Sequence, residues 1–126
     1  MKEAMRYMEN AKEILKQSPI EDRRYKDDKY VKSACGIAYL AILKSIDSYL
    51  IKKGLTRKEM PKSVDAYRKA LQEHLKPYNG KLLRQFEDIY DELHIAGYYR
   101  GNLHTVDAVK AALKTAEDFI KKVSPK

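Results

Sequence analysis

Residues 28–53 read DKYVKSACGIAYLAILKSIDSYLIKK and form the longest segment of helical periodicity in the chain. Their apolar side chains recur three or four residues apart, as on the buried face of an amphipathic helix. These side chains are Val31, Ala34, Cys35, Ala38, Ile42, Ile46, Tyr49 and Leu50. At a rise of ~1.5 Å per residue the helix is roughly 39 Å long, so it can run the length of a small domain. The stretch predicts an all-α fold built around this helix.

The sequence also marks both ends of this helix. Asp27 or Asp28 can accept hydrogen bonds from the first free backbone amides. Two lysines and then Gly54 end the helix, which places cations at the negative end of the helix dipole and a glycine at the left-handed cap. Inside the helix, Gly36 costs on the order of 1 kcal/mol against alanine. Its small neighbours predict the close approach of another helix at this point.

Four further segments show helical spacing on either side. They span about residues 2–17, 61–76, 81–96 and 105–123. Pro61 suits a first helical turn, and Thr105 can cap the last helix. Pro77 and Asn79-Gly80 are expected to end the third helix and turn the chain. No segment alternates apolar and polar residues, so we expect no strands. The prediction is an all-α, antiparallel up-and-down bundle of about five helices, in one domain over residues 1–126.

Composition narrows the class of protein. The single Cys35 forms no intramolecular disulfide, and a reducing compartment is the simplest interpretation. Residues 1–6 lack the apolar core of a signal peptide. No uninterrupted apolar stretch approaches the ~20 residues of a membrane span. We therefore expect a soluble, cytoplasmic protein with no membrane partner.

The net charge of +8 is concentrated in the middle of the chain. Residues 52–84 hold ten Lys and Arg residues against three acids, a surplus of +7. Such a field can attract a polyanion, with Lys62, Arg68 and Lys69 as candidate contacts. The alternative, which we favour, is a lysine-rich solvated surface.

Residues 97–104, GYYRGNLH, place five candidate binding or catalytic residues on a predicted glycine-bounded loop between two helices. They are Tyr98, Tyr99, Arg100, Asn102 and His104. Tyrosines beside an arginine can stack a base and clamp a phosphate. Alternatively, the tyrosines close the end of the bundle, and Arg100 pairs with an acid at the end of the preceding helix, either Asp91 or Glu92.

The sequence supports no metal, cofactor or nucleophile site. A di-iron bundle needs Glu-x-x-His on two helices, whereas this chain has Glu73-His74 and Glu92-Leu93-His94. The two histidines are expected at the helix surface or its boundary. No glycine-flanked serine elbow occurs, and Gly97 and Gly101 lack the Walker lysine pattern. We expect no metal and no cofactor.

The order of these elements resembles the HEPN family of small helical domains. The resemblance rests on the small-residue helix Ser33–Ala41 that runs on to Gly54, the variable middle Tyr67–Gly80, and Tyr99–His104 before an alanine-rich last helix. It implies a compact bundle that commonly dimerises, often beside a nucleotidyltransferase or in a toxin–antitoxin setting. Catalytic members of the family are metal-independent ribonucleases, and Arg100 and His104 fall at the matching place.

The chain departs from the catalytic pattern of that family. Only three residues separate Arg100 from His104, against four to six in catalytic members, and Gly101 stands where a polar residue usually follows the arginine. An RNA-cleaving site needs a base and a cation for the phosphorane, so the residue types are right while the spacing is not. The leading hypothesis is a non-catalytic, homodimeric binding protein. The alternatives are a metal-independent ribonuclease that uses Arg100 and His104, and a basic nucleic-acid-binding protein.

Overall fold

The computed structural model describes residues 2–75 and 80–123, and it confirms the all-α prediction. The helices are α1 (Lys2–Leu15), α2 (Asp28–Lys52), α3 (Val64–His74), α4 (Lys81–Ile89) and α5 (Val106–Val123). Three kinds of smaller element complete the described part of the chain. They are the strands β1 (Ile20–Glu21) and β2 (Arg24–Tyr25), the 3₁₀ turn η1 (Arg57–Glu59), and the π-helix η3 (Tyr90–Tyr99) that continues α4.

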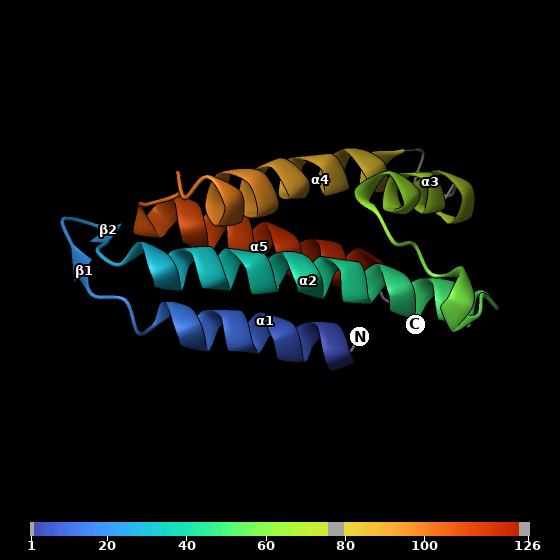
Figure 1. Cartoon of the computed structure of the whole chain (residues 1–126), viewed down its shortest axis with the longest axis horizontal. Helices are drawn as coiled ribbons and strands as arrows, with labels where there is room; N and C mark the ends of the chain where they lie inside the picture. Colours follow the sequence, from blue (N-terminus) through green and yellow to red (C-terminus); the bar gives the residue numbers. More distant parts are fainter. Residues whose placement is uncertain (1, 76–79, 124–126) are drawn as a thin grey trace.

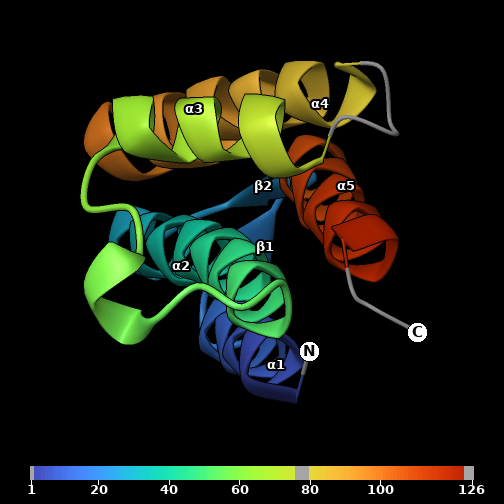
Figure 2. The ribbon, with the colours of Figure 1, turned by 90° about the vertical axis from the view of Figure 1, so that its right-hand side faces the viewer.

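The long helices run up and down beside one another (Figure 1). α1 and α2 lie antiparallel and are joined at one end by the β1–β2 hairpin, while α4 with η3, and then α5, run back and forth along α2. Figure 2 looks along the bundle and shows the short α3 lying across the opposite end, beside α4. The hairpin and the basic segment 52–75 therefore occupy opposite ends of the molecule.

α2 is the central helix, since α1, η3 and α5 all pack against it. Every predicted apolar position of α2 is buried except Tyr49, which is half-buried. By length and composition α2 is also apolar enough to cross a membrane. Half of its most apolar window is buried within the bundle, so packing on three neighbours accounts for that composition. Phe86 and Phe119 extend the core, with ring centroids 6.5 Å apart.

Helix capping follows the sequence at three predicted positions. The Asp27 side chain accepts a hydrogen bond from the Lys29 amide at 3.2 Å, and Thr105 Oγ1 accepts one from the Ala108 amide at 3.2 Å. Gly54 adopts a φ of +104°, the left-handed conformation that favours glycine after a helix.

The third helix starts later than predicted. It begins at Val64, because Ser63 is extended and its hydroxyl accepts a hydrogen bond from the Ala66 amide at 3.1 Å. Serine has a side-chain oxygen that can accept a hydrogen bond from a helix amide, and proline has none. Ser63 therefore caps the helix, and Pro61 lies in the connection before it. The predicted stop at Pro77 and Asn79 lies outside the described residues.

The expectation of no strands is wrong at the connection between α1 and α2. Ile20 pairs with Tyr25 and Glu21 with Arg24 in a two-stranded antiparallel hairpin. Its turn residues Asp22 and Arg23 both have positive φ, at 53° and 62°, the pattern of the type I′ turn that suits tight hairpins. The hairpin also holds the start of α5, because the Tyr25 amide donates to the His104 carbonyl and the Val106 amide donates to the Arg23 carbonyl, each at 2.9 Å.

The predicted boundary between helix and loop near residue 96 is also wrong. From Tyr90 onward the chain continues as a π-helix, in which each amide bonds five residues back, and it runs to Tyr99. The Arg100 amide ends it by donating to the Ile95 carbonyl at 2.8 Å. Tyr98 and Tyr99 therefore lie on a helix, and only residues from Arg100 onward form the connection to α5.

Candidate functional site

Three rings stack along one side of η3. Tyr90, His94 and Tyr98 are spaced four residues apart, and their side chains meet as successive neighbours on the helix surface. The Tyr90 and His94 ring centroids lie 5.2 Å apart with 28° between the planes. Those of His94 and Tyr98 lie 5.8 Å apart at 15°. We call these three residues the aromatic ladder.

Side chains from two other helices fix the ladder in place. The Tyr39 ring of α2 lies 4.7 Å from His94 and 5.8 Å from Tyr90, centroid to centroid. The Arg68 guanidinium of α3 lies 5.3 Å from the centre of the Tyr90 ring, within reach of a cation–π interaction. Burial of the Tyr39 phenol raises its pKa to about 12, so the hydroxyl stays neutral at physiological pH. The contacts with Tyr39 and Arg68 hold the inner edge of the ladder in place.

The outer edge of the ladder borders an open cavity on the surface of α2 and η3. Its volume is about 410 Å³. The lining residues are Ser33, Gly36, Ile37, Tyr39, Leu40, His94 and Tyr98. Two of the lining residues are large apolar side chains with high exposure, Leu40 at 45% and Tyr98 at 49%, and Tyr99, the next residue along η3, is 74% exposed. We call this cavity with its exposed side chains the aromatic face.

The close approach predicted at Gly36 is present, and a second glycine shares it. A methyl group on Gly36 would lie 2.8 Å from Cδ1 of Tyr98. A methyl group on Gly97 would lie 2.6 Å from Sγ of Cys35 and 2.8 Å from its Cβ. Glycines on both helices thus let α2 and η3 touch, and the Tyr98 ring lies over the Gly36 backbone.

The pKa values of two acidic groups near this contact, the Cys35 thiol and the Glu92 carboxyl, are raised by their surroundings. Burial raises the pKa of the Cys35 thiol to about 12, and the charge of Glu92 adds to the effect. Burial, followed by the charge of Asp88, raises the pKa of Glu92 itself. A neutral buried thiol is a poor nucleophile, so Cys35 serves packing.

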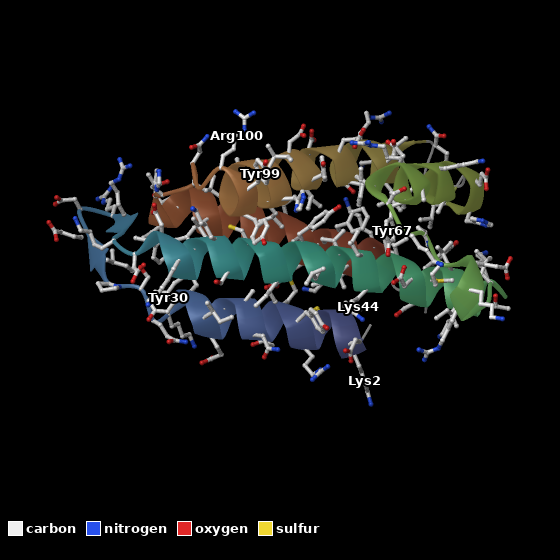
Figure 3. The ribbon with its side chains drawn as sticks, in the orientation of Figure 1. Lys2, Tyr30, Lys44, Tyr67, Tyr99 and Arg100 are labelled. Carbon is white, nitrogen blue, oxygen red and sulfur yellow. The ribbon has the colours of Figure 1, made fainter. Side chains whose placement is uncertain are left out.

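Arg100 does not form the ion pair proposed for it. It is exposed, projects away from the bundle (Figure 3), and makes no ion pair with a described residue. The expected partners stay apart from it: Asp91 is exposed, and Glu92 is half-buried beside α2. Asn102 is exposed as well, with its backbone amide donating to the Ala96 carbonyl at 2.7 Å.

His104 faces the hairpin. Its Nδ1 lies 3.5 Å from Oδ1 of Asp28, at the start of α2. It lines a cavity of about 210 Å³ whose other walls are Glu21, Asp22, Arg24, Tyr25 and Lys26. Arg100 is not among the lining residues, so this cavity does not unite the two proposed catalytic side chains.

The three candidate nucleic-acid contacts differ in their surroundings. Lys62 and Lys69 are exposed. Arg68 is engaged, because its guanidinium donates to Asp65 at 2.6 Å and to Glu87 at 2.7 Å in addition to its contact with Tyr90. It links α3 to α4 and to η3, which leaves little of the guanidinium for a phosphate.

His94 is half-buried on the surface of η3, in agreement with the expected surface or boundary position. The sequence did not predict that it is the middle ring of the ladder and part of the cavity wall. The four-residue spacing of Tyr90, His94 and Tyr98 was the available signal. Within residues 2–75 and 80–123, no group of three His, Cys, Asp or Glu side chains is placed to hold a metal ion.

Comparisons with known proteins agree with the fold. A protein of unknown function from Dyadobacter fermentans is 35% identical to this chain and superposes on it with a TM-score of 0.76. That match covers 95% of this chain and 88% of the Dyadobacter chain. No curated protein matches. Residues 1–125 match the family described as a domain of unknown function, DUF5618. The chain therefore belongs to the DUF5618 family.

Proposed function

We propose that this chain is a non-catalytic, homodimeric binding protein with HEPN-like architecture, and that the aromatic face is its dimer interface. The proposal rests mainly on the exposure of Leu40 and Tyr98 at one cavity, next to the still more exposed Tyr99 in the chain. Large apolar side chains gathered in one patch are uncommon on monomeric proteins and mark interaction surfaces. Tyrosine is also enriched in the cores of protein interfaces.

A second copy suits this surface better than an unrelated partner because of its self-complementary shape. The half-exposed ring of Tyr98 forms one wall of the open cavity, which Ile37 and Leu40 also line. In a two-fold dimer the same patch meets itself, so a ring of one protomer can fill the hollow of the other. The face is also short of charge: none of its lining residues is Lys, Arg, Asp or Glu.

The non-catalytic part of the proposal rests on the separation of the candidate residues. Arg100 projects into solvent, whereas His104 lies beside Asp28 and lines a cavity that Arg100 does not line. A general base and a phosphate-binding cation must reach the same reacting group. If the HEPN resemblance extends to partners, a nucleotidyltransferase or an antitoxin would bind the dimer.

The test is the oligomeric state of the wild type and of two matched variants. Leu40 and Ile51 both lie on α2 and are both 45% exposed, but only Leu40 lines the cavity. We expect light scattering, at a protein concentration on the order of tens of micromolar, to show a dimer for the wild type and for Ile51→Glu. Leu40→Glu and Tyr99→Glu should give folded monomers, as judged by circular dichroism. A monomeric wild type, or a dimer that survives both variants, would refute the proposal.

A further inference from the structure

A third cavity lies on a different side of the molecule from the aromatic face, between α1 and α5. Its volume is about 530 Å³, within the range of roughly 300–1,000 Å³ that is typical of small-molecule sites. The lining residues are Lys12, Leu15, Lys16, Ser18, Ile20, Tyr25, Lys110, Leu113, Lys114 and Glu117. Figure 2 shows α1 and α5 on either side, with the β1–β2 hairpin at the far end between them. None of these residues belongs to the aromatic face.

The floor of this cavity is apolar. Leu15 and Leu113 are buried side chains of α1 and α5 that present their surfaces to it. Ile20 at the hairpin end is 57% exposed, although an isoleucine normally gains by burial. An aliphatic chain in the cavity would cover Ile20 and remove its surface from water, which is favourable by about 25 cal/mol per Å² of apolar area.

The rim is strongly basic. Lys12 on α1 and Lys16 just after its end are four residues apart, as are Lys110 and Lys114 on α5, so two lysine pairs line one cavity against the single acid Glu117. Two like charges four residues apart on a helix repel each other and destabilise the helix. Glu117 is already paired with Lys12, Lys16 with Glu13, and Lys114 with Asp118. Lys110 makes no ion pair with a described residue, which leaves one ammonium group at the rim for an outside anion.

Tyr25 also lines the cavity. The residue is 7% exposed, and its hydroxyl forms no hydrogen bond with a described residue. The hydroxyl oxygen is not among the buried polar atoms that lack a partner, so water reaches it, and a ligand oxygen could replace that water as the acceptor. The cavity thus combines an apolar floor, an unpaired cation and a hydroxyl that is free to donate.

We propose that the α1–α5 cavity binds a small amphipathic monoanion with an aliphatic chain, of the medium-chain carboxylate class. The chain lies over Leu15, Ile20 and Leu113, and the carboxylate is held by the Lys110 ammonium group. Tyr25 sits beside the ligand as a hydrogen-bond donor. The hairpin closes one end of the cavity, which limits the length of the chain that fits and favours a small molecule over a partner helix.

Calorimetry with four probes at concentrations below micelle formation tests the ligand class. Decanoate carries both the chain and the charge, 1-decanol carries the chain alone, acetate carries the charge alone, and decyltrimethylammonium carries the opposite charge. We expect decanoate to bind and the other three to bind at least about tenfold more weakly, since each lacks one of the two interactions. Equal binding of decyltrimethylammonium, or no binding of decanoate, would overturn the proposal.

Matched variants then locate the site. Lys110→Glu should weaken decanoate roughly tenfold or more, whereas Lys121→Glu, an exposed lysine on α5 outside the cavity, should not. Ile20→Ser should weaken it roughly fivefold, whereas Ile51→Ser should not. Both cavity positions are exposed, so the variants should stay folded. Unchanged decanoate affinity in both Lys110→Glu and Ile20→Ser would place any binding elsewhere and refute the assignment.

Discussion

Gly97 of η3 lies so close to Cys35 of α2 that a methyl group in its place would stand 2.6 Å from the sulfur. The same methyl group would also meet the Glu92 carbonyl oxygen at 3.2 Å. Cys35 is fully buried and cannot turn aside. The contact therefore sets how closely the π-helix and the central helix can approach.

We expect Gly97→Ala to lower the free energy of unfolding by about 1–3 kcal/mol, the usual cost of overpacking a core. Urea unfolding followed by circular dichroism measures it. Gly36→Ala is the control, because its methyl would meet the Tyr98 ring, which is 49% exposed and can swing outward. That variant also gains up to ~1 kcal/mol of helix propensity. Equal losses in the two variants would contradict the rigid contact at Cys35.

The Cys35 thiol should be unreactive in the folded protein. Because burial raises its pKa to about 12, almost no thiolate is present at pH 8. A thiol-specific reagent such as Ellman's reagent should therefore react only as fast as the protein opens, and at once in denaturant. Rapid reaction of the native protein, without loss of helical signal, would show that the thiol is accessible.

Glu92→Gln should stabilise the protein at neutral pH. Burial raises the pKa of Glu92 above its ordinary 4.5, so the folded state disfavours its charged form. The folded state then binds the proton more tightly than the unfolded state, and the Glu92 contribution to stability falls as the pH rises through the folded pKa. The gain from glutamine, under about 1 kcal/mol for a half-exposed group, should be present at pH 7 and vanish below pH 4.5. A gain that does not change with pH would point to another cause.

Arg68→Ala should destabilise the protein by about 1 kcal/mol, whereas Lys69→Ala should be nearly neutral. Arg68 joins Asp65, Glu87 and the Tyr90 ring, and its neighbour Lys69 is exposed. Thermal unfolding at low and high salt measures both variants, and the Arg68 effect should shrink in salt because its partners are partly exposed. If Lys69→Ala proved as costly as Arg68→Ala, the assignment of Arg68 to structure would be wrong.

Purified protein should not cleave RNA in the presence of a chelator. The alternative of a metal-independent ribonuclease needs Arg100 and His104 at one phosphate, and Arg100 does not line the cavity that His104 faces. A fluorescent single-stranded RNA reports cleavage sensitively. Cleavage that disappears in both Arg100→Ala and His104→Ala, with the fold retained, would establish the ribonuclease instead.

The helices could be predicted because their information is local. The spacing of Ala4, Met8, Ala11 and Leu15 identifies a buried stripe, and all four are buried. Caps such as Asp27 and Thr105 could be found for the same reason, since a cap depends on residues within one turn. The long apolar face of α2 predicted that other helices surround it.

The features that the sequence missed depend on distant partners. The hairpin turn is Asp22-Arg23 and lacks the glycine that normally signals a type I′ turn. Its conformation is held by hydrogen bonds to residues 104 and 106, far along the chain. The π-helix was missed because its side chains recur at nearly α-helical spacing, while its hydrogen bonds leave no trace in composition. For the same reason the sequence did not predict the aromatic ladder or the position of His94 within it.

The hydrogen bonds between the hairpin and the start of α5 have a consequence for synthesis of the protein. Arg23 and Tyr25 leave the ribosome early, but their partners Val106 and His104 are made some eighty residues later. Until then the paired α1 and α2 expose the surface that α5 will cover, and contacts between positions so distant in sequence form slowly. A nascent chain that stops before α5 should therefore be the species most dependent on chaperones.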